Sequence, residues 1–136
     1  MGNHDLAVKD FLQAIEIDPT YAAAYYHMAT SKFKDGKVRE AIEDFKRSQE
    51  LDDNPGIYDG LGCCYHALKQ YDEAINEFNS AIDKKPRNVE FLKNRAQCFY
   101  DMGQYQSSID DLETALEIND KDPQVLYKQG LSYFTF

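Results

Sequence analysis

The chain has 136 residues, a formal net charge of −9 and three cysteines. Its length is that of one ordinary domain, and no apolar run approaches the roughly 18 residues that a membrane-spanning helix needs, so we expect no membrane association. The acidic balance argues against nucleic-acid binding, because negative side chains repel phosphates, and an odd number of cysteines argues against a disulfide framework.

Two kinds of segment alternate along the chain and predict eight helices. One begins at Ala7 as AVKDFLQAIEIDP and returns at Ala41, Ala74 and Ser108, with starts about 34 residues apart. The other carries apolar and small residues at spacings of three and four, the pattern of an amphipathic helix. In chain order, we expect helices over residues 4–17, 21–34, 37–50, 55–68, 71–84, 89–102, 105–118 and 123–136.

Proline and glycine mark the predicted boundaries. Pro19 and Pro86 stand where the first kind of segment must end, since proline cannot continue a helix. Pro55 and Pro123 stand where the second kind begins, a position that tolerates a missing N–H. The turns that lead into the first kind are marked by Gly2, Gly36, Lys69 and Gly103.

Small and large residues recur at fixed positions in these helices. The small position in the second kind holds Ala29, Gly62, Ala96 and Gly130, which allows two helices to approach closely. The large position in the first kind holds Phe11, Phe45, Phe78 and Leu112. A fixed period with a recurring packing pattern predicts stacked helix pairs rather than one closed globule.

These residues resemble the tetratricopeptide repeat family, whose pattern is W-x2-L-G-x2-Y followed by A, F, A and P. Seven of the eight pattern positions match, with Tyr in place of Trp at the first: Tyr58, Leu61, Gly62, Tyr65, Ala74, Phe78, Ala81 and Pro86. The resemblance implies an all-α, right-handed α-solenoid of antiparallel pairs, helix A then helix B. The units expected are 1–21 (helix B of a truncated repeat), 22–54, 55–88, 89–122 and 123–136 (helix A of a truncated repeat).

The resemblance also implies that the A helices line a concave groove that binds a partner peptide, which makes the chain a protein-interaction module or scaffold. The expected groove residues are Tyr26, His27, Thr30, Phe33, Asp59, Cys63, His66, Lys93, Asn94, Gln97, Tyr100 and Lys128. Because Gly56, Gly60, Cys63 and Ala67 are all small, we expect a wider spot in the middle of the groove. Two alternatives stay open: a structural, self-assembling spacer, and a substrate-recruiting segment of a larger enzyme.

Some family members hold a C-terminal carboxylate with Lys, Asn and Arg side chains on three successive A helices. If the clamp began at the first full repeat, none of the corresponding positions would match. If it began one repeat later, only Asn94 would match, Lys128 would be a loose substitute, and Asp59 would repel a carboxylate. We therefore expect no binding of a chaperone tail through such a clamp.

Neither a metal site nor a catalytic site is expected. The run from Cys63 through Cys64 to His66 has ligand-type residues, but adjacent helical residues point about 100° apart and cannot share one ion. No nucleophile–base set or phosphate-binding glycine loop is present. The sequence thus predicts no enzyme and no cofactor.

The two ends of the array carry further expectations. Leu131, Phe134 and Phe136 would be uncapped, so we expect self-association through them and a fragment of a longer array. The first residues have neither the basic nor the apolar region of a secretory signal, and we expect a cytoplasmic location, with the nucleus as the alternative.

Overall fold

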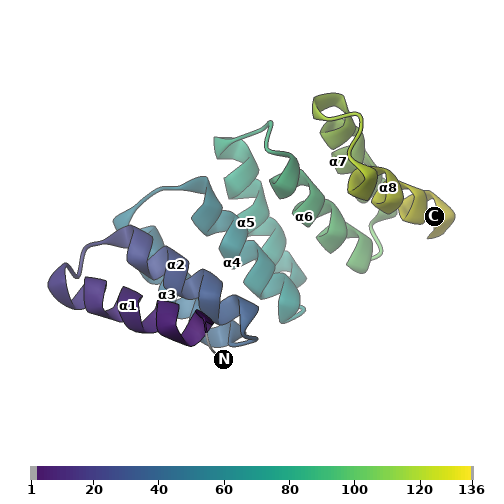
Figure 1. The fold of residues 1–136 in the computed structure, drawn as a ribbon. Coiled ribbons are helices and arrows are strands. Elements are labelled where there is room, and N and C mark those ends of the chain that lie inside the picture. Colours follow the sequence, from purple (N-terminus) through teal and green to yellow (C-terminus); the bar gives the residue numbers. More distant parts are fainter. Residues whose placement is uncertain (1–2, 136) are drawn as a thin grey trace.

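The computed structural model describes residues 3–135, and these residues form eight α-helices and no strand. The chain passes from α1 at one end of the molecule to α8 at the other (Figure 1). The helices are α1 (Asn3–Ile17), α2 (Ala22–Lys34), α3 (Val38–Leu51), α4 (Pro55–Ala67), α5 (Tyr71–Lys84), α6 (Val89–Asp101), α7 (Tyr105–Ile118) and α8 (Pro123–Thr135). Phe136, to which self-association was assigned, lies outside the described residues.

The helix boundaries follow from local chemistry. The Asn54 side chain accepts a hydrogen bond from the Gly56 amide at 2.9 Å, which caps α4, and Asn88 caps α6 through the Phe91 amide at 3.0 Å. The turns before α3, α5 and α7 each need a left-handed residue. Gly36 and Gly103 supply it with φ of 83° and 81°, and Lys69 does so with φ of 61°.

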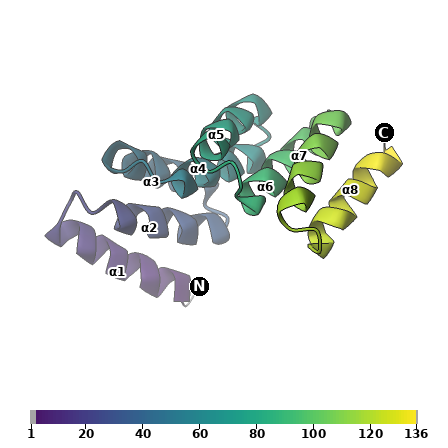
Figure 2. The same cartoon turned by 90° about the horizontal axis from the view of Figure 1, so that it is seen from above.

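The helices stack in one direction as antiparallel pairs. We call α2, α4, α6 and α8 the A helices and α1, α3, α5 and α7 the B helices. Each of α2, α4 and α6 packs along the B helix that follows it, and every B helix also packs on the next A helix. Figure 2 shows the same succession from above. The predicted α-solenoid is confirmed.

The stack curves with the A helices on its inner side. Neighbouring A helices contact each other, α2 with α4, α4 with α6 and α6 with α8, whereas no two B helices do so within residues 3–135. A layer of helices that touch each other is shorter along the stack than a layer of helices that lie apart. The surface of the A helices is therefore concave.

The alternation of small and large residues forms the core. Ala29, Ala96 and Phe78 are fully buried, and burial of one such ring stabilises the fold by roughly 1.5–3 kcal/mol. Lys32, which stands where Tyr65 stands in the next unit, pairs with Asp44 at 2.8 Å, so an ion pair replaces a ring contact there. None of the helices within the described part of the chain has the length and apolarity to cross a bilayer.

Candidate functional site

Hydrogen bonds join α4 to α6 across the concave face. The Asn94 amide donates to both carboxylate oxygens of Asp59, at 3.0 and 3.3 Å. Nearer the other end of the same helices, His66 Nε2 lies 2.6 Å from a carboxylate oxygen of Asp101. Gln97 donates to the other oxygen of Asp101 at 3.1 Å. Four of the expected groove residues are thus fixed in place by each other or by one neighbour.

Asp59 is the most perturbed acid of this face. Burial raises the pKa of its carboxyl to about 6, the hydrogen bond from Asn94 opposes that rise, and nearby Glu90 adds to it. A carboxylate held in this environment at neutral pH favours the approach of a hydrogen-bond donor or a cation over that of another anion.

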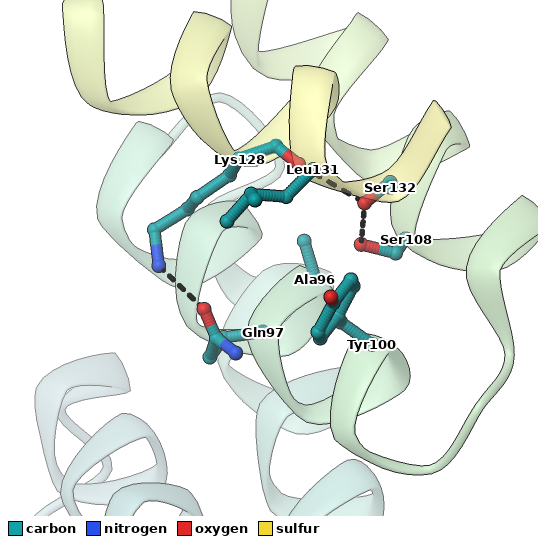
Figure 3. A pocket seen from close by; sticks show the side chains of 7 residues that line it. All are labelled: Ala96, Gln97, Tyr100, Ser108, Lys128, Leu131 and Ser132. Atoms are coloured by element: carbon teal, nitrogen blue, oxygen red, sulfur yellow. Dashed lines mark hydrogen bonds between the residues drawn. The ribbon is translucent and has the colours of Figure 1, made fainter. Parts of the chain in front are cut away.

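A second set of contacts joins α6 to α8. Lys128 Nζ donates to Gln97 Oε1 at 2.7 Å, and the Tyr100 hydroxyl lies 2.9 Å from that of Thr135. A cavity of about 20 Å³, room for one water molecule, lies between these helices and α7 (Figure 3). Its floor includes the buried Ser108–Ser132 pair at 3.2 Å. The cavity is too small for a peptide side chain.

Lys93 lies on an A helix, as predicted, but its ammonium group is surrounded by partners within the chain. The residue is 5% exposed, and its Nζ lies 2.8 Å from Glu90, 3.2 Å from Asp122 and 3.0 Å from Gln124. An ammonium group has three donors, and three oxygens surround this one. Lys93 joins α6 to the start of α8 and leaves no donor for a ligand.

The α2 end of the face is aromatic and more open. His27 is exposed, with the Phe11 ring stacked at 5.8 Å, and Tyr26 meets Phe45 edge-on at 5.8 Å. Burial raises the pKa of the Tyr26 phenol, and the Asp59 carboxylate raises it further. Thr30 and Phe33 complete this end and are half-buried.

A cleft of about 210 Å³ opens beside these aromatics, between α2, the end of α3 and the start of α4. The expected groove residues include only Tyr26 and His27 of its wall, because the cleft also takes in the end of α3 and the loop before α4, which lie outside the faces of the A helices. The cleft is lined by Ala22, Ala23, Tyr26, His27, Ser48, Asp52, Asn54 and Ile57.

The wider spot predicted in the middle of the groove is wrong. A Cβ on Gly60 would lie 2.5 Å from the Phe45 ring, and one on Gly56 would lie 3.0 Å from the Tyr26 hydroxyl. The missing side chains of these two glycines therefore make room for rings of the chain itself rather than for a ligand.

The cysteines pack as small apolar residues. Cys64 and Cys98 are fully buried, and burial raises the pKa of Cys64 to about 12 and that of Cys98 to about 11. Burial also raises the pKa of Cys63, and nearby Asp59 adds to the rise. Among the described residues, no three His, Cys, Asp or Glu side chains are grouped so that they could hold a metal ion.

Three family models match the chain. Models described as "Tetratricopeptide repeat" match residues 65–130 and 26–88, and one described as "TPR repeat" matches residues 1–36. The chain belongs to the tetratricopeptide repeat family. This TPR array spans 29% of the length of one curated relative, DnaJ homolog subfamily C member 3 of Bos taurus, with 23% identity over 150 residues and 96% of the array covered.

Solved TPR structures share the fold at low identity. The crystal structure of MamA has a TM-score of 0.89 and 20% identity, covering 98% of the array and 78% of that chain. The first TPR of Spaghetti (RPAP3), bound to the HSP90 peptide SRMEEVD, has a TM-score of 0.79 and 19% identity, covering 83% of the array and 90% of that chain.

Proposed function

We propose that this TPR array binds a peptide segment of a partner protein along the concave face of the A helices, without catalysis. One observation carries the proposal: within residues 3–135 the A helices contact each other and the B helices do not, so the A helices form a trough. The structural neighbour from RPAP3 holds a peptide on the same kind of repeat. We place the repeat units at 22–54, 55–88 and 89–122. We also propose the cytoplasm as the compartment of the protein, because its three free thiols stay reduced there.

The partner contacts differ along the trough. The α2 end offers His27, Tyr26 and the adjoining cleft to an aromatic or apolar side chain. The α6 and α8 end offers the amides of Asn94 and Gln97 and the ammonium group of Lys128. Asp59 orients Asn94, and Gln97 and Lys128 are bonded to each other. Donors that are fixed before binding lose little entropy when a peptide arrives.

The proposed peptide is an internal segment rather than a free C-terminus. Asn94, the one residue that matches the carboxylate clamp, already donates to the Asp59 carboxylate. A second carboxylate at that place would face the first at short range. Lys93, a further cation of α6, has its donors occupied.

The trough is tested with peptides selected from a random phage-displayed library against the folded array. His27→Ala and Gln97→Ala should each weaken a selected peptide about tenfold, measured by fluorescence anisotropy. Glu117→Ala, an exposed change on α7, serves as the matched control. If neither groove variant weakens any selected peptide, the trough is not the binding site.

Two forms of one peptide test whether the array binds an internal segment rather than a free C-terminus. The peptide SRMEEVD with a free carboxylate and the same peptide amidated should both bind weakly and equally. Low-micromolar binding of the free acid alone would show that a clamp exists despite the Asp59–Asn94 pair.

A further inference from the structure

The cleft between α2, α3 and α4 is open at a place that side chains fill between α6 and α8. Ala23 and Asn54 hold the repeat positions of Glu90 and Asp122. Those two acids pair with Lys93 at 2.8 and 3.2 Å and close around its ammonium group. Ala23 has no such side chain, and a cleft of about 210 Å³ lies beside it. Since α1 packs on α2 and α5 packs on α4, this cleft lies inside the array.

One part of the cleft suits an aromatic ring. Ala22, Ala23 and Ile57 give it short apolar walls. The rings of Tyr26 and His27 also line it and stand at 78° to each other, with centroids 5.2 Å apart. A ring that enters can stack on one of them and meet the other edge-on, the two arrangements that aromatic pairs prefer. An enclosed cavity of about 150 Å³ holds benzene, so the cleft has room for one ring.

The polar part of the cleft offers both an acceptor and a donor. One carboxylate oxygen of Asp52 accepts from the Asp53 amide at 2.8 Å, and a carboxylate has sites for further donors. The Asn54 carbonyl oxygen accepts from the Gly56 amide at 2.9 Å, and its NH₂ group donates to no atom of the described residues. A hydroxyl group can donate to Asp52 and accept from Asn54, whereas an ammonium or guanidinium group can only donate. The tyrosine side chain, a ring with a hydroxyl, therefore matches both parts.

The chain already makes such a contact in the same loop. The Tyr58 hydroxyl donates to one carboxylate oxygen of Asp53 at 2.8 Å, and Lys84 donates to the other at 2.6 Å. Asp53 is thus occupied by partners within the chain. Its neighbour Asp52 is exposed, and no side chain of residues 3–135 donates to it. Asp52 is the acid of this loop that remains for a hydroxyl group of another molecule.

We propose that the bound peptide inserts a tyrosine side chain into this cleft, with its ring against Tyr26 and His27 and its hydroxyl on Asp52. The inference rests on the proposed function, since it names a side chain by which the array recognises its partner. It also implies a means of release. A phosphate on that tyrosine carries up to about two negative charges and would lie next to Asp52 and Asp53, so phosphorylation of the partner expels the side chain from the cleft.

Peptides selected from the random library against the folded array test the inference. Sequencing should show tyrosine enriched at one position of the selected peptides. Phenylalanine at that position should weaken binding about tenfold in fluorescence anisotropy, because Asp52 and Asn54 lose their partner. Ala23→Glu places in the cleft the side chain that Glu90 has on α6, at an exposed site, and should abolish the difference between tyrosine and phenylalanine. Asn76→Glu, the same change in charge at an exposed site on α5, should preserve it.

Phosphorylated peptides test the contact with Asp52 directly. The phosphotyrosine form of a selected peptide should bind at least about tenfold more weakly than the unmodified form, and Asp52→Asn should reduce that difference to about threefold. Peptides that need Gln97 but bind equally well with tyrosine, phenylalanine or arginine at the selected position would overturn this inference and leave the proposed function standing. If neither His27→Ala nor Gln97→Ala weakens any peptide, both are wrong.

Discussion

Gly62 lies against the ring of Phe78 so closely that a Cβ on the glycine would be 2.5 Å from Cε1 of the ring. Gly130 stands at the same repeat position two A helices further on. Apart from its chain neighbours and the backbone of its own helix, no atom of the described residues lies within 4 Å of the corresponding point. Close packing thus requires glycine at this repeat position in α4, whereas among the described residues nothing packs against the same position in α8.

The same substitution at these two glycines should have opposite effects. Gly62→Ala should lower the free energy of unfolding by about 1–3 kcal/mol, because the methyl group overlaps the Phe78 ring. Gly130→Ala should raise it by about 0.5–1 kcal/mol, because alanine is the better helix former and nothing is displaced. Urea unfolding followed by circular dichroism at low protein concentration measures both, and equal effects would contradict the packing described.

Asp59 should make stability depend on pH. Its pKa is raised from 3.8 to about 6 in the folded protein, chiefly by burial, so the folded state binds the proton more tightly than the unfolded state does. The contribution of this group is fully present below about pH 4 and is lost as the pH rises through about 6. The loss is on the order of 1–3 kcal/mol.

The variant Asp59→Asn isolates this effect. It keeps an acceptor for Asn94 and removes the charge, so its melting temperature should exceed that of the unchanged protein at pH 7, and the difference should vanish near pH 4. Asp72→Asn, a change at an exposed acid on α5, is the control and should show no such pH-dependent gain. A difference that grows as the pH falls would contradict the direction assigned to the Asp59 pKa.

The Arg95–Asp111 pair should behave as one unit. Asp111 is 6% exposed and accepts two hydrogen bonds from the guanidinium, which also donates to Asn79 at 2.8 Å. Arg95→Ala leaves a buried carboxylate without its partner and should cost about 2–4 kcal/mol. The double change with Asp111→Ala should cost less than the two single changes added together, by about 1–3 kcal/mol in a double-mutant cycle. Simple additivity would mean that the pair is not coupled.

The three thiols should react only when the array opens. Burial raises the pKa of Cys64 to about 12 and of Cys98 to about 11, and it raises that of Cys63 as well, so few thiolates exist at pH 8. Ellman's reagent should label the native protein far more slowly than the protein in urea. Rapid labelling of one thiol in native buffer would show that its helix is open to solvent.

The fold could be predicted from the sequence because the repeat period and the residues at the helix ends determine structure locally. The segment expected over residues 71–84 is the helix Tyr71–Lys84, and the one expected over 55–68 ends one residue earlier, at Ala67. Proline and the left-handed turn residues fix these ends without reference to the rest of the chain.

The chemistry of the groove could be predicted only in part. A repeat position assigns Lys93 to the inner face, but its partners Asp122 and Gln124 lie about 30 residues further along the chain, and only the packing of α6 on α8 brings them to it. Likewise, the small Gly60 suggests open space until the position of the Phe45 ring is known. Sequence periodicity gives the face on which a side chain lies and does not give what fills the space beside it.

All contacts between helices in the described part of the chain join helices that are neighbours or next neighbours along the sequence. Such local topology lets a chain fold quickly, since no long loop has to close first. It also means that no distant element anchors the terminal helices. Pulling the two termini apart should therefore unravel the array helix by helix from its extremities, with a low force at each step, instead of rupturing it in one event.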